Sequence, residues 1–433
     1  MDILTVSLIF IGLSVVLIIA GIPIAYVLGF CTVLGILFGA GGASLTKLGL
    51  TPFSVFHGLN WLPLPMFIMM AYIISETDIG KDIFATANKW LSRVPGGLVV
   101  AAIWAEAAMA ATMGASGTTI LTVGTVAVPE MERLGCDKKF CVGALLCGGV
   151  LGPLIPPSIP FIVYAILSQQ SIARLFMAGI IPGILLAVML SAYAMVACLV
   201  KPALAPRPAA VNLKERVLSL RKVWPVIVLI VGILGGIYKG VVTATEAGGA
   251  GVIIILLIAI VFYRFRHANL GRAISESATL TGMIGLMIIA STVFTFVVGV
   301  SGLAQKLSSM IIASGWSPWL VVIIINIALL ILGCIMDGLA IMMVTMPLFI
   351  PIIIGMGFDP VWFGVLVTVN IEIGLITPPV ALNLFIASGT FHIPVADVIR
   401  GMTPFLVVLL VFLCVLIAFP SISLWLPNLM GGG

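Results

Sequence analysis

The sequence predicts an all-α membrane protein built from two inverted repeats, each with a re-entrant helical hairpin and a helix broken at a Pro-Pro pair. Three observations predict this fold class: 62% of the 433 residues are hydrophobic and 8% are charged, the two halves align with each other, and Pro-Pro recurs at equivalent places. Such a composition cannot cover a folded chain with a water-compatible surface, so the chain is expected to lie in a bilayer.

Long hydrophobic runs follow one another along the whole chain. They lack the alternation of polar and apolar residues that marks barrel strands, so they predict helices. The first run has no basic stretch before it and no small-residue cleavage site after it, and is expected to be a retained helix. The runs lie at about 3–19, 24–39, 62–76, 97–113, 139–151, 179–200, 223–237, 247–262, 280–300, 318–336, 361–376 and 402–420.

The second half of the sequence repeats the first at an offset of 222 residues. This shift places Pro156-Pro157 on Pro378-Pro379 and Asp137 on Asp359. A composition rich in glycine gives chance glycine matches, but not prolines and an aspartate in one register, which indicates an internal repeat. The predicted organisation is a first repeat at 1–200, a basic linker at 201–222, a second repeat at 223–420 and a C-terminal tail at 421–433.

Basic residues indicate how each half is oriented. The linker holds six of the 20 lysines and arginines, which predicts a cytoplasmic location by the positive-inside rule. Residues 81–139 carry six more, whereas the equivalent 303–361 carry only Lys306. The halves are therefore predicted to face opposite ways, as in secondary transporters. Since the net charge of +5 comes mostly from residues between the runs, no nucleic-acid binding is expected.

Each half contains a predicted re-entrant hairpin. In the first, 97–131, two apolar segments are interrupted at GASGTT (114–119) and have positive charge at both outer ends. In the second, 318–353, the interruption is GCIMDGLA (333–340). A non-helical tip at membrane depth is tolerated where it lines a cavity or is buried in protein. Two ordinary short spans joined by a tight turn are the alternative.

Each hairpin is followed by a predicted broken helix, at 139–169 and 360–390, which contains LIPPSIP (154–160) or ITPPVAL (376–382). Proline removes backbone donors and clashes with the preceding turn, so carbonyls upstream lose their helical partners and can bind a cation. The N-terminal ends of the half-helices suit a carboxylate. The alternative is a kink that serves packing alone.

Two further groups of residues stand out. Segments 79–94, 171–178, 302–313 and 394–400 have mixed polarity and predict interfacial helices.

Four acids lie in or beside apolar runs, where burying an aspartate in the membrane costs about 2.5–3.5 kcal/mol. Thr243 and Glu246 predict a capping box. Asp337 is the best functional candidate, whereas Glu106 and Glu372 are expected to be hydrogen-bonded structural groups, with proton transfer as the alternative.

Several stretches resemble the large membrane (permease, M) subunit of tripartite ATP-independent periplasmic (TRAP) transporters, in the same order and over nearly the whole chain. This resemblance implies an ion-transporter superfamily elevator fold and sodium-coupled import of a small organic acid, of the C4-dicarboxylate, sialic acid or sugar acid class, across a bacterial inner membrane. It also implies two partners, a small four-helix membrane subunit and a periplasmic substrate-binding protein. The stretches are VPEMERLGCDKKF (128–140), GPLIPPSIP (152–160), LFMAGIIPG (175–183), TEAGG (245–249) and VNIEIGLITPPVALNLFIASG (369–389).

The resemblance also implies site residues. A first sodium site would use Gly114, Ser116, Gly117, Thr118, Gly152, Pro153 and Pro157; a second would use Asp337, Gly338, Gly374, Thr377 and Pro379; the substrate would lie near Thr119, Ser158 and Asn383. The sequence departs from the family at the first tip, where Gly-Thr-Thr replaces a frequent Gly-Ser followed by a small residue, and at Ala381, where glycine is frequent.

No enzymatic activity and no cofactor other than Na⁺ are expected. The sequence has no G-x-S-x-G, H-E-x-x-H, Walker or G-x-G-x-x-G arrangement in a matching context, so an ion gradient must supply the energy. Its seven cysteines and three histidines are scattered without metal-ligand spacing. The rival interpretations are a stand-alone ion-coupled dicarboxylate carrier that needs no binding protein, a channel, and an intramembrane enzyme.

Overall fold

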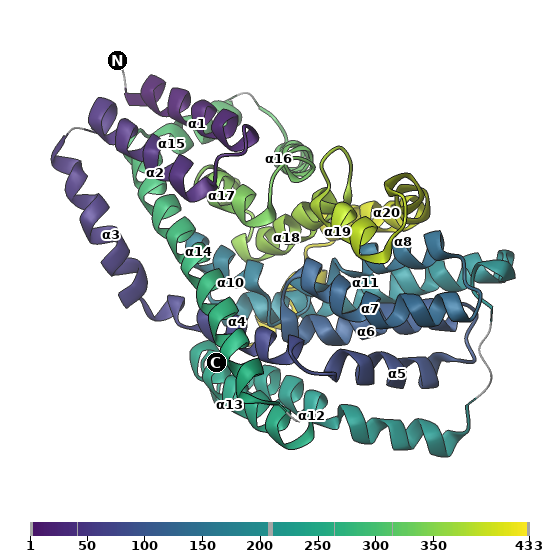
Figure 1. Ribbon diagram of the computed structural model, residues 1–433. Helices are drawn as coiled ribbons and strands as arrows, with labels where there is room; N and C mark the ends of the chain where they lie inside the picture. Colours follow the sequence, from purple (N-terminus) through teal and green to yellow (C-terminus); the bar gives the residue numbers. More distant parts are fainter. Residues whose placement is uncertain (1–2, 41, 207–210, 264, 314, 431–433) are drawn as a thin grey trace.

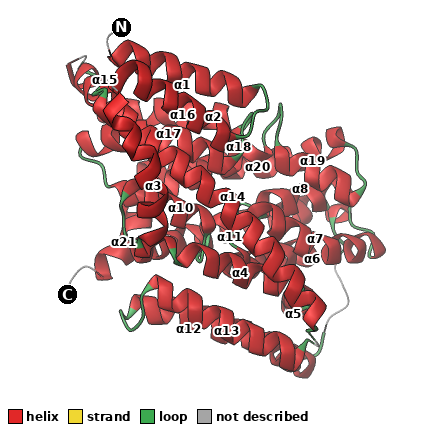
Figure 2. Cartoon of the chain, turned by 60° about the vertical axis from the view of Figure 1, so that its left-hand side comes forward, coloured by secondary structure: helices red, strands yellow, loops and turns green. Residues whose placement is uncertain are grey.

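The computed structural model describes residues 3–40, 42–206, 211–263, 265–313 and 315–430, and these residues form helices and connecting loops without any strand (Figures 1 and 2). Six helices are long and apolar enough to cross a membrane, or up to eight if each of two bent pairs counts as one span. The prediction of an all-α membrane protein is confirmed.

The helices of the first half run in a fixed order. They are α1 (Ile3–Ile19), α2 (Ile24–Gly35), α3 (Thr46–His57), α4 (Pro63–Ser75), α5 (Ile79–Leu91), α6 (Gly97–Met113), α7 (Ser116–Arg133), α8 (Lys138–Gly148), α9 (Leu151–Leu154), α10 (Ile159–Ser168) and α11 (Ile172–Val200).

The second half repeats this order. Its helices are α12 (Leu213–Tyr238), α13 (Ala244–Phe262), α14 (His267–Val300), α15 (Leu303–Ala313), α16 (Pro318–Gly333), α17 (Gly338–Gly355), α18 (Pro360–Ile376), α19 (Leu382–Phe391) and α20 (Val395–Ala418), and α21 (Ser421–Met430) follows. Shifted by 222 residues, α7 coincides with α17 at both ends. The two halves differ in one respect. In the first half, α3 and α4 are separate helices that meet at a bend of 64°, whereas the equivalent part of the second half is the continuous helix α14.

Local sequence explains where several helices begin. Asp137 Oδ1 accepts a hydrogen bond from Phe140 N at 2.9 Å, and Asp359 Oδ1 accepts one from Val361 N at 2.7 Å. The aligned aspartates are therefore the N-caps of α8 and α18. The predicted capping box is confirmed too, since Thr243 N donates to Glu246 Oε2 at 2.8 Å and Glu246 N donates to Thr243 Oγ1 at 3.2 Å.

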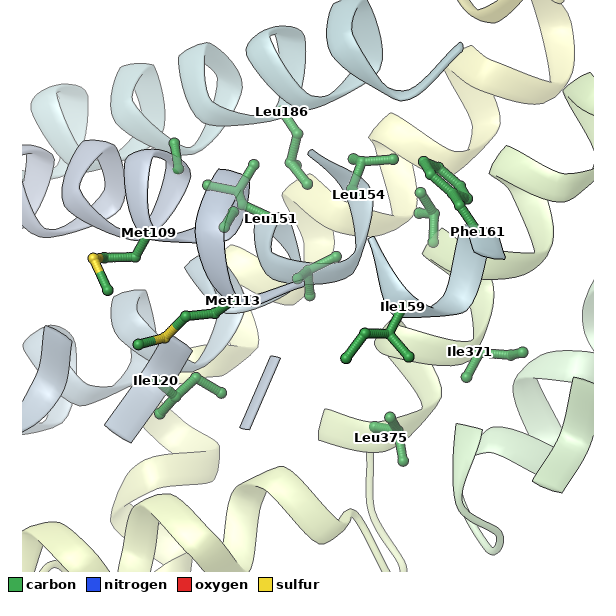
Figure 3. Close-up of a cluster of buried hydrophobic side chains, with 14 of the residues drawn as sticks. Met109, Met113, Ile120, Leu151, Leu154, Ile159, Phe161, Leu186, Ile371 and Leu375 are labelled. Carbon is green, nitrogen blue, oxygen red and sulfur yellow. The ribbon is translucent and has the colours of Figure 1, made fainter. Parts of the chain in front are cut away.

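Packing divides the helices into two blocks. One contains both hairpins and both broken helices, where α8 packs on α20, α16 on α18 and α6 on α11. The other contains α1 to α4 and α12 to α14, where α4 packs on α13 and α14 on α2. Figure 3 shows part of the core of the first block, where Leu151, Leu154 and Ile159 of the first broken helix lie among side chains of α6, α7 and α11.

Two of the predicted interfacial helices are not separate elements. Segments 171–178 and 394–400, expected as separate interfacial helices, are the first turns of the long helices α11 and α20. Ser171 caps α11 through Arg174 N, and no break follows before the apolar run. The predicted linker 201–222 contains the start of α12, and the predicted tail contains α21, which packs on α11.

The helical start of α12 has a packing reason, because it supports the arm helix α5. Thr86 Oγ1 donates to the Ser219 carbonyl at 3.3 Å, and Lys222 Nζ lies 3.2 Å from Asp82 Oδ1. The Tyr263 hydroxyl donates to Asp82 Oδ2 at 3.3 Å. Burial, with Asp82 acting in the same direction, raises the pKa of Tyr263 above its usual range, so this hydroxyl remains a donor.

Candidate functional site

The first hairpin tip docks on the first helix break. Between α6 and α7, Gly114 has φ +64°, and its carbonyl accepts a hydrogen bond from Ile159 N at 3.3 Å. A Cβ at Gly114 would lie 2.8 Å from the Pro157 carbonyl oxygen. Glycine is therefore required here both for its left-handed backbone and for the close approach of the two chain segments.

The same tip also contacts Gly152, just before the break. A Cβ at Gly152 would lie 2.9 Å from the Ala115 carbonyl oxygen. The hydroxyls of Thr118 and Thr119 donate to that carbonyl at 3.0 and 2.8 Å. Buried Ser158 accepts from Phe161 N at 3.2 Å and caps α10. The structure thus brings Gly114, Gly152, Pro157, Thr118 and the substrate candidates Thr119 and Ser158 into one tip-and-break contact.

The second tip meets the second break in a similar way. A Cβ at Gly374 would lie 2.4 Å from Gly333 Cα, so the two backbones touch. The Cys334 carbonyl accepts from Val380 N at 3.1 Å and from Ala381 N at 3.4 Å. Ala381 has φ +46°, a left-handed conformation that favours glycine.

Three other residues predicted for the second sodium site have different surroundings. Asp337 caps α17, its Oδ2 accepting from Leu339 N at 3.0 Å and Ala340 N at 3.4 Å. Thr377 donates its hydroxyl to the Ile373 carbonyl at 2.6 Å. Pro379 is exposed, in contrast to the buried Pro157 of the first half. The second break is therefore open where the first is covered.

A cavity of about 260 Å³ lies where the two halves meet. Seven of the predicted site residues line it: Ser116, Gly117, Thr118, Pro153, Asp337, Gly338 and Asn383. The other eight do not line it: Gly114, Thr119, Gly152, Pro157, Ser158, Gly374, Thr377 and Pro379. Among these eight residues, Gly114, Gly152, Pro157 and Gly374 lie in the close contacts between a tip and a break.

The polar centre of this cavity joins the two repeats. Asn383 Nδ2, at the start of α19, donates to Ser116 Oγ, at the start of α7, at 2.9 Å. Ser116 also interacts with the carboxyl of Glu372, which has Asp337 as a charged neighbour. Glu372 is 5% exposed, and its Oε2 has no hydrogen-bond partner among the described residues.

The expectation that Glu106 is a satisfied structural group is wrong, and Glu372 is satisfied only in part. Both carboxyl oxygens of fully buried Glu106 lack a partner in the described part of the chain, as does Glu372 Oε2. The two residues differ in position, because Glu372 lines the central cavity and Glu106 packs against Gly148, away from it. The sequence does contain an indication that Glu372 lies in the site, because it is two residues before Gly374 and therefore beside the break.

The electrostatics of the cavity are unusual for a site that would hold an anion. Among its described lining residues there is no lysine, arginine or histidine, and there are two carboxyls, Asp337 and Glu372. Positive potential comes instead from helix ends, because the first turns of α7, α10, α17 and α19 all line the cavity. Such a site can hold carboxylates at helix ends together with cations at the carboxyls.

No group of three or more His, Cys, Asp or Glu side chains arranged to hold a metal ion occurs within the described ranges. Of the seven cysteines, six are buried and none is in a disulfide. The site therefore offers oxygen ligands from carboxyls, hydroxyls, an amide and backbone carbonyls, which are the ligands that hard cations prefer.

Comparisons with known proteins agree with this architecture. Residues 11–422 match the family described as "Tripartite ATP-independent periplasmic transporter, DctM component". The chain is 36% identical over 389 residues to the C4-dicarboxylate TRAP transporter large permease protein DctM of Pseudomonas aeruginosa, covering 90% of this chain and 91% of that protein. It is 30% identical over 377 residues to the sialic acid TRAP transporter large permease protein SiaM of Vibrio cholerae, covering 86% of this chain and 87% of that protein.

A solved structure shares the fold. The YdaH transporter of Alcanivorax borkumensis superposes with a TM-score of 0.65 at 14% identity, covering 96% of this chain and 98% of that chain. The family match spans both hairpins, both broken helices and the cavity between them. The chain therefore belongs to the DctM family, the large permease components of tripartite ATP-independent periplasmic transporters.

Proposed function

We propose that this chain imports a small organic acid together with Na⁺, as the large permease of a TRAP transporter in a bacterial inner membrane. The single observation that carries this proposal is the central cavity, where four helix N-termini and two carboxyls converge without a basic side chain among the described lining residues. An anion held there has only helix ends and bound cations to balance its charge.

Sodium coupling follows from that charge balance. Asp337 faces the cavity, and its negative charge repels a carboxylate unless a cation lies between them. Substrate and Na⁺ therefore favour each other's binding, which is the thermodynamic basis of symport. Two tips docked on two breaks suggest two sodium sites, the first at Ser116 to Thr118 and the second at Asp337 and Gly338.

The proposed substrate is a C4-dicarboxylate. The relative from Pseudomonas aeruginosa, at 36% identity, is named for C4-dicarboxylates, and the helix ends occur in two pairs, one from each repeat, which suit one carboxylate each. Sialic acid, for which the Vibrio cholerae relative is named, is the second substrate class to test.

The transport cycle is an elevator movement. The block that contains the hairpins and broken helices moves against the block of α1 to α4 and α12 to α14, while the arms α5 and α15 connect the two. The halves face opposite ways in the membrane, with the basic linker in the cytoplasm. A periplasmic binding protein delivers the substrate, and a small four-helix membrane subunit completes the complex.

The test is uptake of labelled succinate into proteoliposomes that contain the whole membrane complex, with its binding protein outside. Uptake should require the binding protein and an inward sodium gradient together. Full-rate uptake without sodium would refute the coupling. Full-rate sodium-driven uptake without the binding protein would instead favour a stand-alone carrier.

A further inference from the structure

A second cavity, of about 380 Å³, opens between the arm α5, the hairpin helix α6 and α12, away from the central cavity. Its lining is apolar except for Thr86 and includes two tryptophans, Trp90 of α5 and Trp104 of α6. Trp90 is 42% exposed and Trp104 is 36% exposed, so the groove is open to the surroundings of the chain. Nothing in the proposed transport cycle uses this groove.

The wall formed by α12 has the length of one membrane leaflet. Leu220, Val223, Ile227 and Ile230 line the groove and recur at helical spacing on one face of α12. At the helical rise per residue, the distance from Leu220 to Ile230 is about 15 Å. Half of a bilayer hydrocarbon core is also about 15 Å. The groove therefore fits an acyl chain lying along α12.

A guanidinium with two donor atoms that have no acceptor among the described residues lies at the N-terminal end of this stripe. Arg216 is one turn before Leu220 on the same face, and its Nε and Nη2 atoms are buried with no acceptor among the described residues. Its carbonyl accepts from Trp90 Nε1 at 3.1 Å, which places Arg216 beside the groove. Helical side chains lean toward the N-terminus, so the guanidinium lies beyond the apolar part of the groove.

We propose that this groove binds one anionic phospholipid of the cytoplasmic leaflet, with an acyl chain along α12 and its phosphate at Arg216. A guanidinium recognises a phosphate with two parallel hydrogen bonds, which supplies the missing acceptors. A tryptophan at the level of the headgroups is typical of membrane interfaces. The leaflet follows from the orientation in the proposed function, and the bound lipid contacts both the hairpin helix α6 and α12.

The experiment measures lipid binding without transport, so its outcome is independent of sodium coupling. The full-length protein is placed in nanodiscs of mixed phosphatidylglycerol and phosphatidylethanolamine, then extracted mildly, and the retained lipid is identified by native mass spectrometry. The wild type should retain one phosphatidylglycerol. Arg216→Gln should lower this retention about fivefold, the loss expected for one basic residue.

Three variants sharpen the result. Lys214→Gln removes the same charge from another face of α12, and should retain lipid as the wild type does. Arg216→Lys keeps the charge and should restore part of the retention. Ala108→Trp fills the groove and should lower retention, whereas Ala250→Trp, at an exposed position of α13, should not.

The proposal is overturned if Arg216→Gln and Lys214→Gln retain equal amounts of phosphatidylglycerol, or if Ala108→Trp retains as much as the wild type. It is also overturned if the groove binds a protein, as would be found when a photo-crosslinker at position 108 labels the small subunit and no lipid.

Discussion

Asp337 and Asp359 are both aspartates that cap a helix, yet only Asp337 lines the central cavity. Their capping bonds are of the same kind, so a change from aspartate to asparagine removes a negative charge at either position while keeping an oxygen for the cap. The pair therefore separates a role in cation binding from a role in helix stability.

Asp337→Asn is expected to raise the sodium concentration for half-maximal uptake about tenfold, equivalent to about 1.4 kcal/mol of binding free energy. Ser116→Ala, at the other tip, should act in the same direction. Asp359→Asn is the matched control and should leave sodium dependence unchanged. The measurement is a sodium titration of succinate uptake in proteoliposomes. Unchanged sodium affinity in both tip variants would remove these residues from the site.

Glu372 and Glu106 form a second matched pair, because both are buried carboxyls with an unpartnered oxygen among the described residues, and only Glu372 faces the cavity. Glu372→Gln should weaken sodium activation of uptake about tenfold, since it removes a carboxyl group that can bind a cation next to Asp337. Glu106→Gln should leave sodium activation unchanged. Equal sodium curves for both variants would contradict a role for Glu372 in cation binding.

At the scale of elements, the contact of each tip with its break depends on backbone approach. The Gly374 and Gly333 backbones touch, and Gly152 lies against the Ala115 carbonyl. The broken helix contributes an equivalent glycine to the contact in both repeats, because Gly152 and Gly374 align at the 222-residue offset. The hairpin and the broken helix are therefore one packed unit in each half.

Gly374→Ala is expected to destabilise that unit by about 1–3 kcal/mol, because a new Cβ would overlap Gly333 with no room to move. Transport should fall together with the melting temperature of the detergent-solubilised protein. Gly389→Ala, in the neighbouring helix α19, meets no atom within 4 Å and should be tolerated. A melting temperature for Gly374→Ala equal to that of Gly389→Ala would refute the contact.

For the whole molecule, the elevator proposal concerns the boundary between the two blocks. Phe67 of α4 and Phe176 of α11 pack across that boundary with ring centroids 5.7 Å apart. Tyr193 of α11 and Phe405 of α20 pack with ring centroids 4.7 Å apart, and both belong to the block that contains the hairpins. The proposed movement separates Phe67 from Phe176, whereas Tyr193 and Phe405 move together.

Cysteines at 67 and 176, joined by a bifunctional thiol reagent in a background without the native cysteines, should therefore stop uptake, and reductant should restore it. Cysteines at 193 and 405 joined in the same way should leave uptake intact. Uptake that survives the first cross-link would show that the blocks do not separate there during transport.

Sequence reasoning reached much of this architecture because its signals were local or periodic. The two Pro-Pro pairs and the Thr243–Glu246 capping box depend on residues close together in the chain, and the 222-residue offset is a regularity of the sequence that reappears in the matching bounds of α7 and α17. Segments 171–178 and 394–400 were misjudged because mixed polarity alone does not end a helix, and both are continuous with apolar helices.

Composition, the internal repeat and the order of the motifs are properties of the chain, so the helical membrane class, the repeat and the family could be predicted from the sequence. The tertiary structure was needed to show that Ser116 of one repeat meets Asn383 of the other, that Glu372 faces the cavity and Glu106 does not, and that Arg216 Nε and Nη2, near an apolar groove, have no acceptor among the described residues. These contacts join residues distant in the chain, and burial or pairing of a polar group depends on which helices fold against it.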